Sequence, residues 1–534
     1  MSAARLPRWL PVALGIAPAG FLIVLHLWPF TTLIVRALSD GVGDAADVFG
    51  RARTWRVIWF TTWQAVLSTV ITLVVGLTPA FVLARFRFPG RRLLGGLLTA
   101  AFVMPTVVMG AAMLAVLPAS LERGVVAILA AHVTFNLAVV VRTVGAVWEH
   151  LPEDMESAAA TLGASPWRVA REITIPLIRP AIVAAAAIVF GFTFTSYGVI
   201  RVLGDVGTST VEVEIWRRAT QLGDLPGAAV LALAQLLVVV AVVAWTDRQQ
   251  RRHTRALGLR THSPRRPPRP GHERRLVGGT GVVTTLIVVA PLVALVERSL
   301  RTRTGHSLEA WRTLGQPEVR RGIRTGADPL DALVRSLTTT GVATVVAVTL
   351  GGLAALTVAA GHRRGRVLDV GLMLPLATSA VTIGFGMLIT FNRDPLDWRA
   401  SWWLVPLGHA MVAVPFVVRV VLPVLRGVDP ALSEAAATLG ASPVRAWREI
   451  VVPHLWRPLT AAAGVAAAIS LGEFGATSML ARRDGETLPV AIERLLGRTG
   501  TVLHAQAYCL AVILAVATVV VVVTLDGGDG AHRS

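Results

Sequence analysis

One carboxylate, Glu473, falls inside an apolar segment of the chain, between Leu471-Gly472 and Phe474-Gly475. A charge near the centre of a lipid bilayer costs at least ~2.5–3.5 kcal/mol, so we expect this side chain to face protein or water. Two interpretations remain open. Glu473 lines a pathway through the protein, opposite Ser196, or it lies near the end of its segment and pairs with the backbone or an arginine.

Two histidines and two arginines recur at a constant spacing. His409 follows His132 by 277 residues, and Arg419 follows Arg142 by the same distance. Histidines in apolar segments are more often buried hydrogen-bonding residues than metal ligands, so no metal site is predicted here. The arginines lie near predicted helix ends, where their long side chains can extend to the membrane surface.

The residue types that are missing from the chain exclude several kinds of site. The chain has one cysteine, Cys509, and no lysine, so it can form no internal disulfide. Without lysine it has neither a standard phosphate-binding loop of its own nor a Schiff-base site. It also lacks an HExxH motif and any cluster of nucleophile and base. We therefore predict no catalytic residue, no metal and no bound cofactor, and we do not expect an enzyme.

Composition indicates that lipid is the solvent for much of the chain. Of 534 residues, 54% are hydrophobic and 16% are charged, whereas soluble domains carry about 25% charged residues. The net charge of +19 comes entirely from arginine. A basic chain can bind nucleic acid, but in an apolar chain arginines more often fix orientation at a membrane face. We therefore predict a membrane protein that does not bind nucleic acid.

Apolar stretches long enough to cross a bilayer occur throughout the sequence. Their length and lack of alternation favour helices over barrel strands, so the fold class is all-α with about twelve transmembrane helices. The predicted spans are 10–37, 57–84, 93–117, 124–147, 180–200, 226–246, 276–296, 333–360, 367–391, 402–425, 459–480 and 505–525.

Arginine-rich turns predict the orientation and the domain boundary. The turns at 85–92 and 361–366 and the segment 247–275, which has ten arginines and four prolines, fall on one side of the predicted topology. This side is interpreted as cytoplasmic, which places both termini inside a bacterial plasma membrane. The loop 297–332, with seven arginines, is an exception. We predict six-helix domains over 1–246 and 276–534, joined by a flexible linker at 247–275.

A nine-residue sequence occurs twice, as residues 158–166 and 435–443, again 277 residues apart. Both copies lie between the fourth and fifth spans of a six-span half, so the halves are predicted to be parallel repeats. We name residues 156–176 and 433–453 the first and second repeated loops. Each reads as helix, turn, helix. The interpretation as a docking surface for another protein is favoured over a tight packing loop left by a duplication.

The turn residues support this local structure in both copies. Gly163 and Gly440 suit a left-handed helix end, while Ser165 and Ser442 suit the cap of the next helix. Each is followed by a proline that fits the first helical turn. Pro176 and Pro453 are expected to end that second helix.

The repeated loops resemble the EAA loop of binding-protein-dependent ABC importer permeases. The second copy has Glu434, Ala435, Ala436, Gly440 and Pro453 at the motif positions, and the first has Ala158, Ala159, Gly163 and Pro176. In the first copy Ser157 occupies the glutamate position, directly after Glu156. This resemblance implies the type I importer fold. The arrangement of two fused six-helix domains is similar to that of iron(III) and thiamine importer permeases. That similarity also rests on residues 470–475, 487–490, 211–215 and 225–229.

This resemblance implies the function and the partners. The chain would be the permease of an ATP-driven importer, with two separate ATPase subunits docked on the repeated loops. An extracytoplasmic binding protein would deliver iron(III), thiamine or another small solute. The alternative is a twelve-span secondary transporter driven by an ion gradient, which would have no use for the doubled loop.

Overall fold

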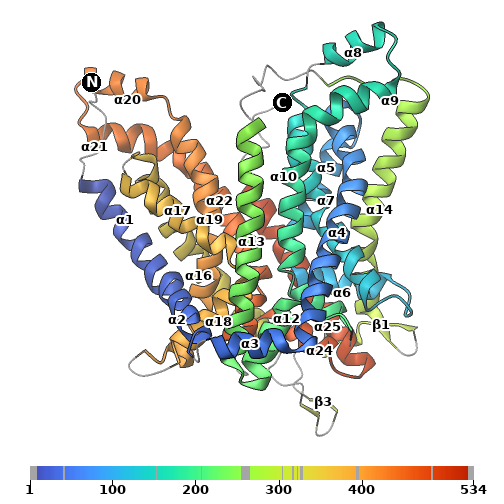
Figure 1. Cartoon of the computed structure of the whole chain (residues 1–534), viewed down its shortest axis with the longest axis vertical. Coiled ribbons are helices and arrows are strands. Elements are labelled where there is room, and N and C mark those ends of the chain that lie inside the picture. Colours follow the sequence, from blue (N-terminus) through green and yellow to red (C-terminus); the bar gives the residue numbers. More distant parts are fainter. Residues whose placement is uncertain are drawn as a thin grey trace.

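The computed structural model describes residues 9–526 except 40–41, 152, 206, 254–264, 303–304, 315–317, 321–322, 325–328, 362, 393–395 and 483–484. Within these residues the regular secondary structure is helical apart from two small antiparallel hairpins and one isolated bridge between Phe86 and Arg266. Long helices run along the molecule, and short helices gather at its two ends (Figure 1). This agrees with the predicted all-α fold.

The first half of the chain is built from long helices joined by short ones. Its elements are α1 (Trp9–Leu22), η1 (Ile23–Leu27), α2 (Trp28–Ala37), α3 (Val42–Gly50), α4 (Ala52–Arg85), α5 (Arg91–Val103), α6 (Thr106–Val116), α7 (Val125–Trp148), α8 (Glu153–Thr161), α9 (Pro166–Val169), η2 (Ala170–Thr174), α10 (Ile175–Phe194), α11 (Gly198–Leu203), α12 (Val211–Arg217), η3 (Arg218–Leu222) and α13 (Leu225–His253).

The second half repeats this order, with the hairpins inserted after its first helix. Its elements are α14 (His272–Leu300), β1 (Arg301–Thr302), β2 (Gly305–His306), α15 (Glu309–Arg312), β3 (Glu318–Arg320), β4 (Ile323–Arg324), α16 (Pro329–Ala359), α17 (Arg363–Ala377), α18 (Ala380–Thr390), η4 (Trp398–Ala400), α19 (Leu404–Gly427), α20 (Pro430–Thr438), α21 (Pro443–Ala446), η5 (Trp447–Val451), α22 (Val452–Gly472), α23 (Gly475–Leu480), α24 (Leu488–Leu496) and α25 (Thr501–Asp526).

Ten described helices are long and apolar enough to cross a membrane, and two bent pairs bring the number to twelve if each is one span. The bent pairs, α5–α6 at 108° and α17–α18 at 102°, replace the predicted straight spans 93–117 and 367–391. Pro105 lies at the first break, where it lacks an N–H to continue the helix. Ser379 caps α18 at the second, accepting from the Thr382 N–H.

The first helix of each half packs against helices of the other half. Helix α1 packs against α16 and α17, while α14 packs against α4, α5 and α6 (Figure 1). Leu22 of α1 belongs to the apolar cluster of the second half, and Val288 of α14 belongs to that of the first. The two halves are therefore tied together by exchanged helices as well as by the linker.

Apolar side chains cover much of the outer surface of the long helices. Val74 and Val282 remain 68% and 60% exposed, as expected for helices that face hydrocarbon rather than water. A third apolar cluster combines short helices of both halves and includes Tyr197, Phe385, Phe474 and Leu488. This cluster closes the molecule at the end opposite α8 and α20 (Figure 1).

The described ends of the linker contact the helical body. Helix α13 continues to His253, and residues 265–270 lie against the turn between α4 and α5. There the Arg87 N–H donates to the Arg266 carbonyl at 2.9 Å, and the Arg266 N–H donates to the Arg85 carbonyl at 3.2 Å. Arg265 pairs with Glu149 at 2.8 Å. Backbone and charged groups thus hold residues 265 and 266, while residues 254–264, where a flexible segment is predicted, lie outside the described residues.

Candidate functional site

The first repeated loop is a tight turn between α8 and α9. Gly163 has a φ of 83°, a conformation that costs other L residues free energy. The Ala164 N–H donates to the Ala159 carbonyl at 3.0 Å, which closes the end of α8. Ser165 then caps α9 by accepting from the Arg168 N–H at 3.3 Å. The expected glycine stop and serine cap are both present.

The second repeated loop has the same geometry between α20 and α21. Gly440 has a φ of 86°, and the Ala441 N–H donates to the Ala436 carbonyl at 3.0 Å. Ser442 accepts from the Arg445 N–H at 3.3 Å. Both loops lie at the same end of the molecule (Figure 1). The identical sequence therefore produces identical backbone structure in two places.

Pro176 and Pro453 do not end a helix, which corrects the sequence-based expectation. In both copies the short second helix continues through a π-helical turn, η2 or η5, into the long helix α10 or α22. Each proline occupies the first turn of that long helix. A proline in a regular helix interior clashes with the carbonyl four residues earlier, and the wider π turn accommodates it. Each loop is thus rigidly continuous with a membrane-spanning helix.

The corners of the loops expose apolar side chains. Leu162 and Leu439, at equivalent positions, are 89% and 88% exposed, and Trp167 is 70% exposed. A Cβ atom added at Gly163 or Gly440 would meet open space. Ala158 and Ala435 are exposed, while Ala159 and Ala436 are half-buried. Small residues and an uncovered leucine make each corner a surface that another protein can approach closely.

The glutamates of the two loops differ in their surroundings. Glu156 pairs with Arg85 at 3.0 Å and accepts from the Thr174 hydroxyl at 2.8 Å. Arg85 itself is 5% exposed, so this contact anchors the first loop to the helical body. Glu434 is exposed. The glutamate that precedes Ser157 therefore makes a structural contact in the first loop.

Glu473 and Ser196 lie at the closed end of the interface between the halves. Glu473 follows the end of α22 rather than lying within a span, and its carboxylate accepts from the Ala476 N–H at 2.9 Å. Its partner is thus a backbone group, as one of the two interpretations expected. Ser196 bonds to His132 Nε2 at 2.9 Å. Within the described residues no hydrogen bond joins Ser196 to Glu473.

An aromatic pair brings the two halves together beside these residues. The rings of Tyr197 and Phe474, 277 positions apart, have centroids 5.1 Å apart and are buried. Arg201 of α11 pairs with Glu493 of α24, and its guanidinium lies 4.0 Å from the centre of the Trp216 ring. These contacts close the interface at the end opposite the repeated loops.

The repeated histidines are buried hydrogen-bonding residues, as predicted. His132 contacts Ser68 at 3.1 Å in addition to Ser196, and His409 contacts Ser470 at 2.8 Å and Thr477 at 2.7 Å. Both ring nitrogens of each histidine are occupied by hydroxyl groups. Across the described ranges no group of three His, Cys, Asp or Glu residues is arranged to hold a metal ion.

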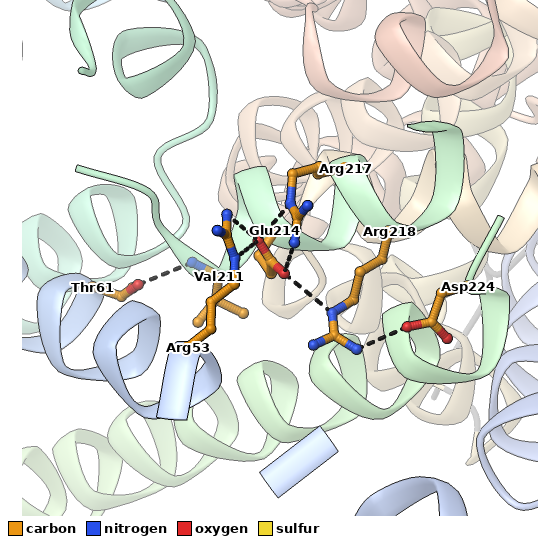
Figure 2. A network of polar contacts seen from close by, with 7 residues as sticks. All are labelled: Arg53, Thr61, Val211, Glu214, Arg217, Arg218 and Asp224. Atoms are coloured by element: carbon orange, nitrogen blue, oxygen red, sulfur yellow. Dashed lines mark hydrogen bonds and ion pairs between the residues drawn. The ribbon is translucent and has the colours of Figure 1, made fainter. Parts of the chain in front are cut away.

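Sequence reasoning missed a cluster of charges around α12 (Figure 2). Glu214 is fully buried and is bound by Arg217 at 2.6 Å and by Arg53 at 3.3 Å. Burial would raise the pKa of Glu214, but hydrogen bonds and charges from Arg217 and Arg53 outweigh it and hold the pKa below its usual value. The alternating glutamates of residues 211–215, inside an apolar run, were the available signal.

Figure 2 also shows how this cluster fixes α12 in place. Arg218 contacts Glu214 at 3.3 Å and Asp224 at 2.8 Å. The Val211 N–H, at the start of α12, donates to the Thr61 hydroxyl of α4 at 2.9 Å. An equivalent bond in the second half joins the Leu488 N–H to Ser336 of α16 at 2.7 Å.

Comparison with known proteins places these features in context. Residues 73–255 and 347–527 each match the family described as "Binding-protein-dependent transport system inner membrane component". The chain is 26% identical to the thiamine transport system permease protein ThiP of Salmonella typhimurium over 92% of each protein. It is 28% identical to ThiP of Brucella abortus, over 99% of this chain and 97% of that protein. A solved chain from a bacterial ABC transporter that imports alginate has a TM-score of 0.40 and 17% identity, covering 46% of this chain and 96% of its own.

Proposed function

The chain belongs to the family of binding-protein-dependent transport system inner membrane components, and from this premise we propose that it carries thiamine across a bacterial plasma membrane. As a permease it provides a pathway and a movable helix bundle, while separate ATPase subunits supply the energy. A gradient-driven transporter has no support, since this family matches both halves. The near-full-length relatives named for thiamine favour this cargo over iron(III).

The observation that carries the ATPase assignment is the pair of matching corners. Leu162 and Leu439 occupy equivalent positions in the α8–α9 and α20–α21 turns, which lie at one end of the molecule (Figure 1), and both side chains are almost fully exposed. In water such side chains are unfavourable, and covering each one stabilises a complex by about 1.5–3 kcal/mol. Two ATPase subunits, one for each corner, are the partners whose symmetry fits two equivalent sites.

This assignment sets the orientation and the path of the mechanism. The repeated loops face the cytoplasm, with both termini on that side. The interface closed by Tyr197 and Phe474 then faces the binding protein. Because each loop continues through a π turn into α10 or α22, closure of the ATPase dimer moves these helices. Their far ends lie next to Ser196 and Glu473, so this movement opens the pathway where cargo enters.

Radiolabelled thiamine uptake tests the proposal. The chain is expressed with an ATPase and a secreted binding protein chosen from the same genome as candidate partners, in cells that lack other thiamine uptake. We expect accumulation that requires all three proteins and that excess iron(III) citrate does not reduce. Uptake of iron(III) in place of thiamine contradicts the cargo assignment, and uptake without the ATPase contradicts the class of transporter.

A further inference from the structure

A second buried glutamate, Glu212 of α12, differs from its neighbour Glu214 in having an unsatisfied oxygen. Glu212 is fully buried and accepts from Gln235 Nε2 at 2.5 Å through Oε1. Its Oε2 atom and the Gln235 Oε1 atom have no partner with good hydrogen-bond geometry, although the Ser379 side chain of the second half is near enough to interact with the Glu212 carboxylate. Within the described part of the chain no arginine pairs with Glu212. A buried carboxylate of this kind is costly unless a positive group compensates it.

Gln235 lines a small cavity between the two halves. The cavity has a volume of about 10 Å³, which is room for about one water molecule. Its polar lining comes from both halves, with Thr195 and Gln235 from the first and Thr378, Ser379 and Thr382 from the second. It lies where α13 meets the break between α17 and α18. Any relative movement of the halves therefore changes its size.

Two further groups lie within electrostatic range of Glu212. Glu473 of the second half is near enough to repel the Glu212 charge electrostatically. Tyr197 is also within electrostatic range of Glu212, and it packs against Phe474. Carboxylates and aromatic rings gathered in one region are a combination that recognises organic cations, because ring faces and carboxylates both carry negative potential.

We propose that Glu212, Glu473, Gln235, Tyr197 and Phe474 form a binding site for an organic cation on the transport path between the halves. The inference rests on the proposed thiamine cargo, whose thiazolium ring carries a permanent positive charge. In the closed arrangement the aromatic rings pack on each other. When the halves separate, the rings and the free carboxylate oxygen become available to the cation. The site therefore binds a positively charged cargo more tightly than a neutral one at the point where cargo enters.

The test uses thiamine uptake by the complete transporter, with Glu212→Gln, Glu212→Asp, Glu473→Gln and the control Glu309→Gln. Glutamine keeps the shape and the hydrogen bond to Gln235 but removes the charge, whereas aspartate keeps the charge. We expect Glu212→Gln and Glu473→Gln to lower uptake per molecule of membrane-inserted protein by about tenfold, or ~1.4 kcal/mol. Glu212→Asp is expected to retain most uptake. Glu309, exposed at the start of α15, is expected to tolerate the change.

The outcomes separate this inference from the proposed function. Uptake within about twofold of wild type for both glutamine variants overturns the cation site and leaves thiamine transport intact. Equal loss in Glu212→Asp and Glu212→Gln also overturns it, because shape rather than charge would then matter. If wild-type protein takes up no thiamine, the cargo assignment fails and the inference falls with it. If the Glu212→Gln protein does not reach the membrane, thiamine uptake by the Glu473→Gln variant tests the cation site instead.

Discussion

The two repeated loops share a backbone but are attached to the protein differently. Both have the left-handed glycine, the serine cap and the exposed leucine. Among the described residues only the first has such contacts, Arg85–Glu156–Thr174, since Ser433 and Val451 stand 277 positions after Glu156 and Thr174. The backbone shape of the corner is thus duplicated, but the side-chain contacts that hold the loop to the helical body are not. We infer that docking constrains the corner, and that the first loop follows its helices more rigidly than the second.

The largest expected effect comes from changing both corners at once. In the Gly163→Leu, Gly440→Leu double variant, each leucine must adopt a left-handed conformation at a cost of about 1–2 kcal/mol. Because a Cβ atom meets open space at both positions, insertion into the membrane should be normal. ATP-driven uptake should fall to background. The matched control, asparagine at both positions, tolerates this conformation and should keep more uptake; wild-type uptake by the leucine variant would rule out a docking role.

A smaller effect is expected from a single corner leucine. Leu162→Ser and Leu439→Ser each remove an apolar contact worth about 1.5–3 kcal/mol when buried. Each should weaken binding of the ATPase to the detergent-solubilised permease by about tenfold or more. Binding affinities measured by biolayer interferometry test this. An effect at one corner only would show that the ATPases dock unequally, and no effect at either would exclude the leucines from the interface.

The difference between the loops is tested by Arg85→Gln, with Arg363→Gln at the exposed start of α17 as the control. Removing Arg85 leaves Glu156 without its buried partner, at a cost of about 1–3 kcal/mol. Hydrogen exchange of backbone amides in 153–169 should accelerate about tenfold, while that in 430–446 should not change. Arg363→Gln should leave both loops as they are. Equal acceleration of both loops by Arg85→Gln would contradict a local anchor.

The smallest effect is expected at the docked end of the linker. Arg265 and Glu149 are partly exposed, 33% and 22%, and such pairs contribute about 0.2–1 kcal/mol. Arg265→Ala should therefore change amide exchange in 85–92 by less than about fivefold and leave uptake intact. A loss of uptake comparable to that of the glycine double variant would mean that the linker takes part in coupling.

The sequence predicted those features that depend on local chemistry. Runs of apolar residues located the spans, and the Gly163 and Gly440 corners follow from the backbone freedom of glycine. The duplicated motif identified the family. Pro176 and Pro453 were misjudged because a π turn is not visible in residue types.

Features that depend on long-range packing escaped prediction. The exchange of α1 and α14 between the halves depends on contacts with helices far away in the sequence. Glu212 and Glu214 lie two residues apart in the same segment, yet only Glu214 meets arginines. Arg53 comes from a helix 161 residues earlier. No spacing rule within α12 distinguishes the two carboxylates.

Photo-crosslinking from the two corners tests the central claim most directly. A benzophenone amino acid is placed at Leu162 or Leu439, and as a control at Trp456, which is 72% exposed on the long helix α22. The permease is coexpressed with its ATPase and irradiated in membranes. We expect crosslinks to the ATPase from both corners and none from position 456. Absence of ATPase crosslinks from both corners, in a complex that still transports thiamine, would contradict the assignment of the repeated loops as docking sites.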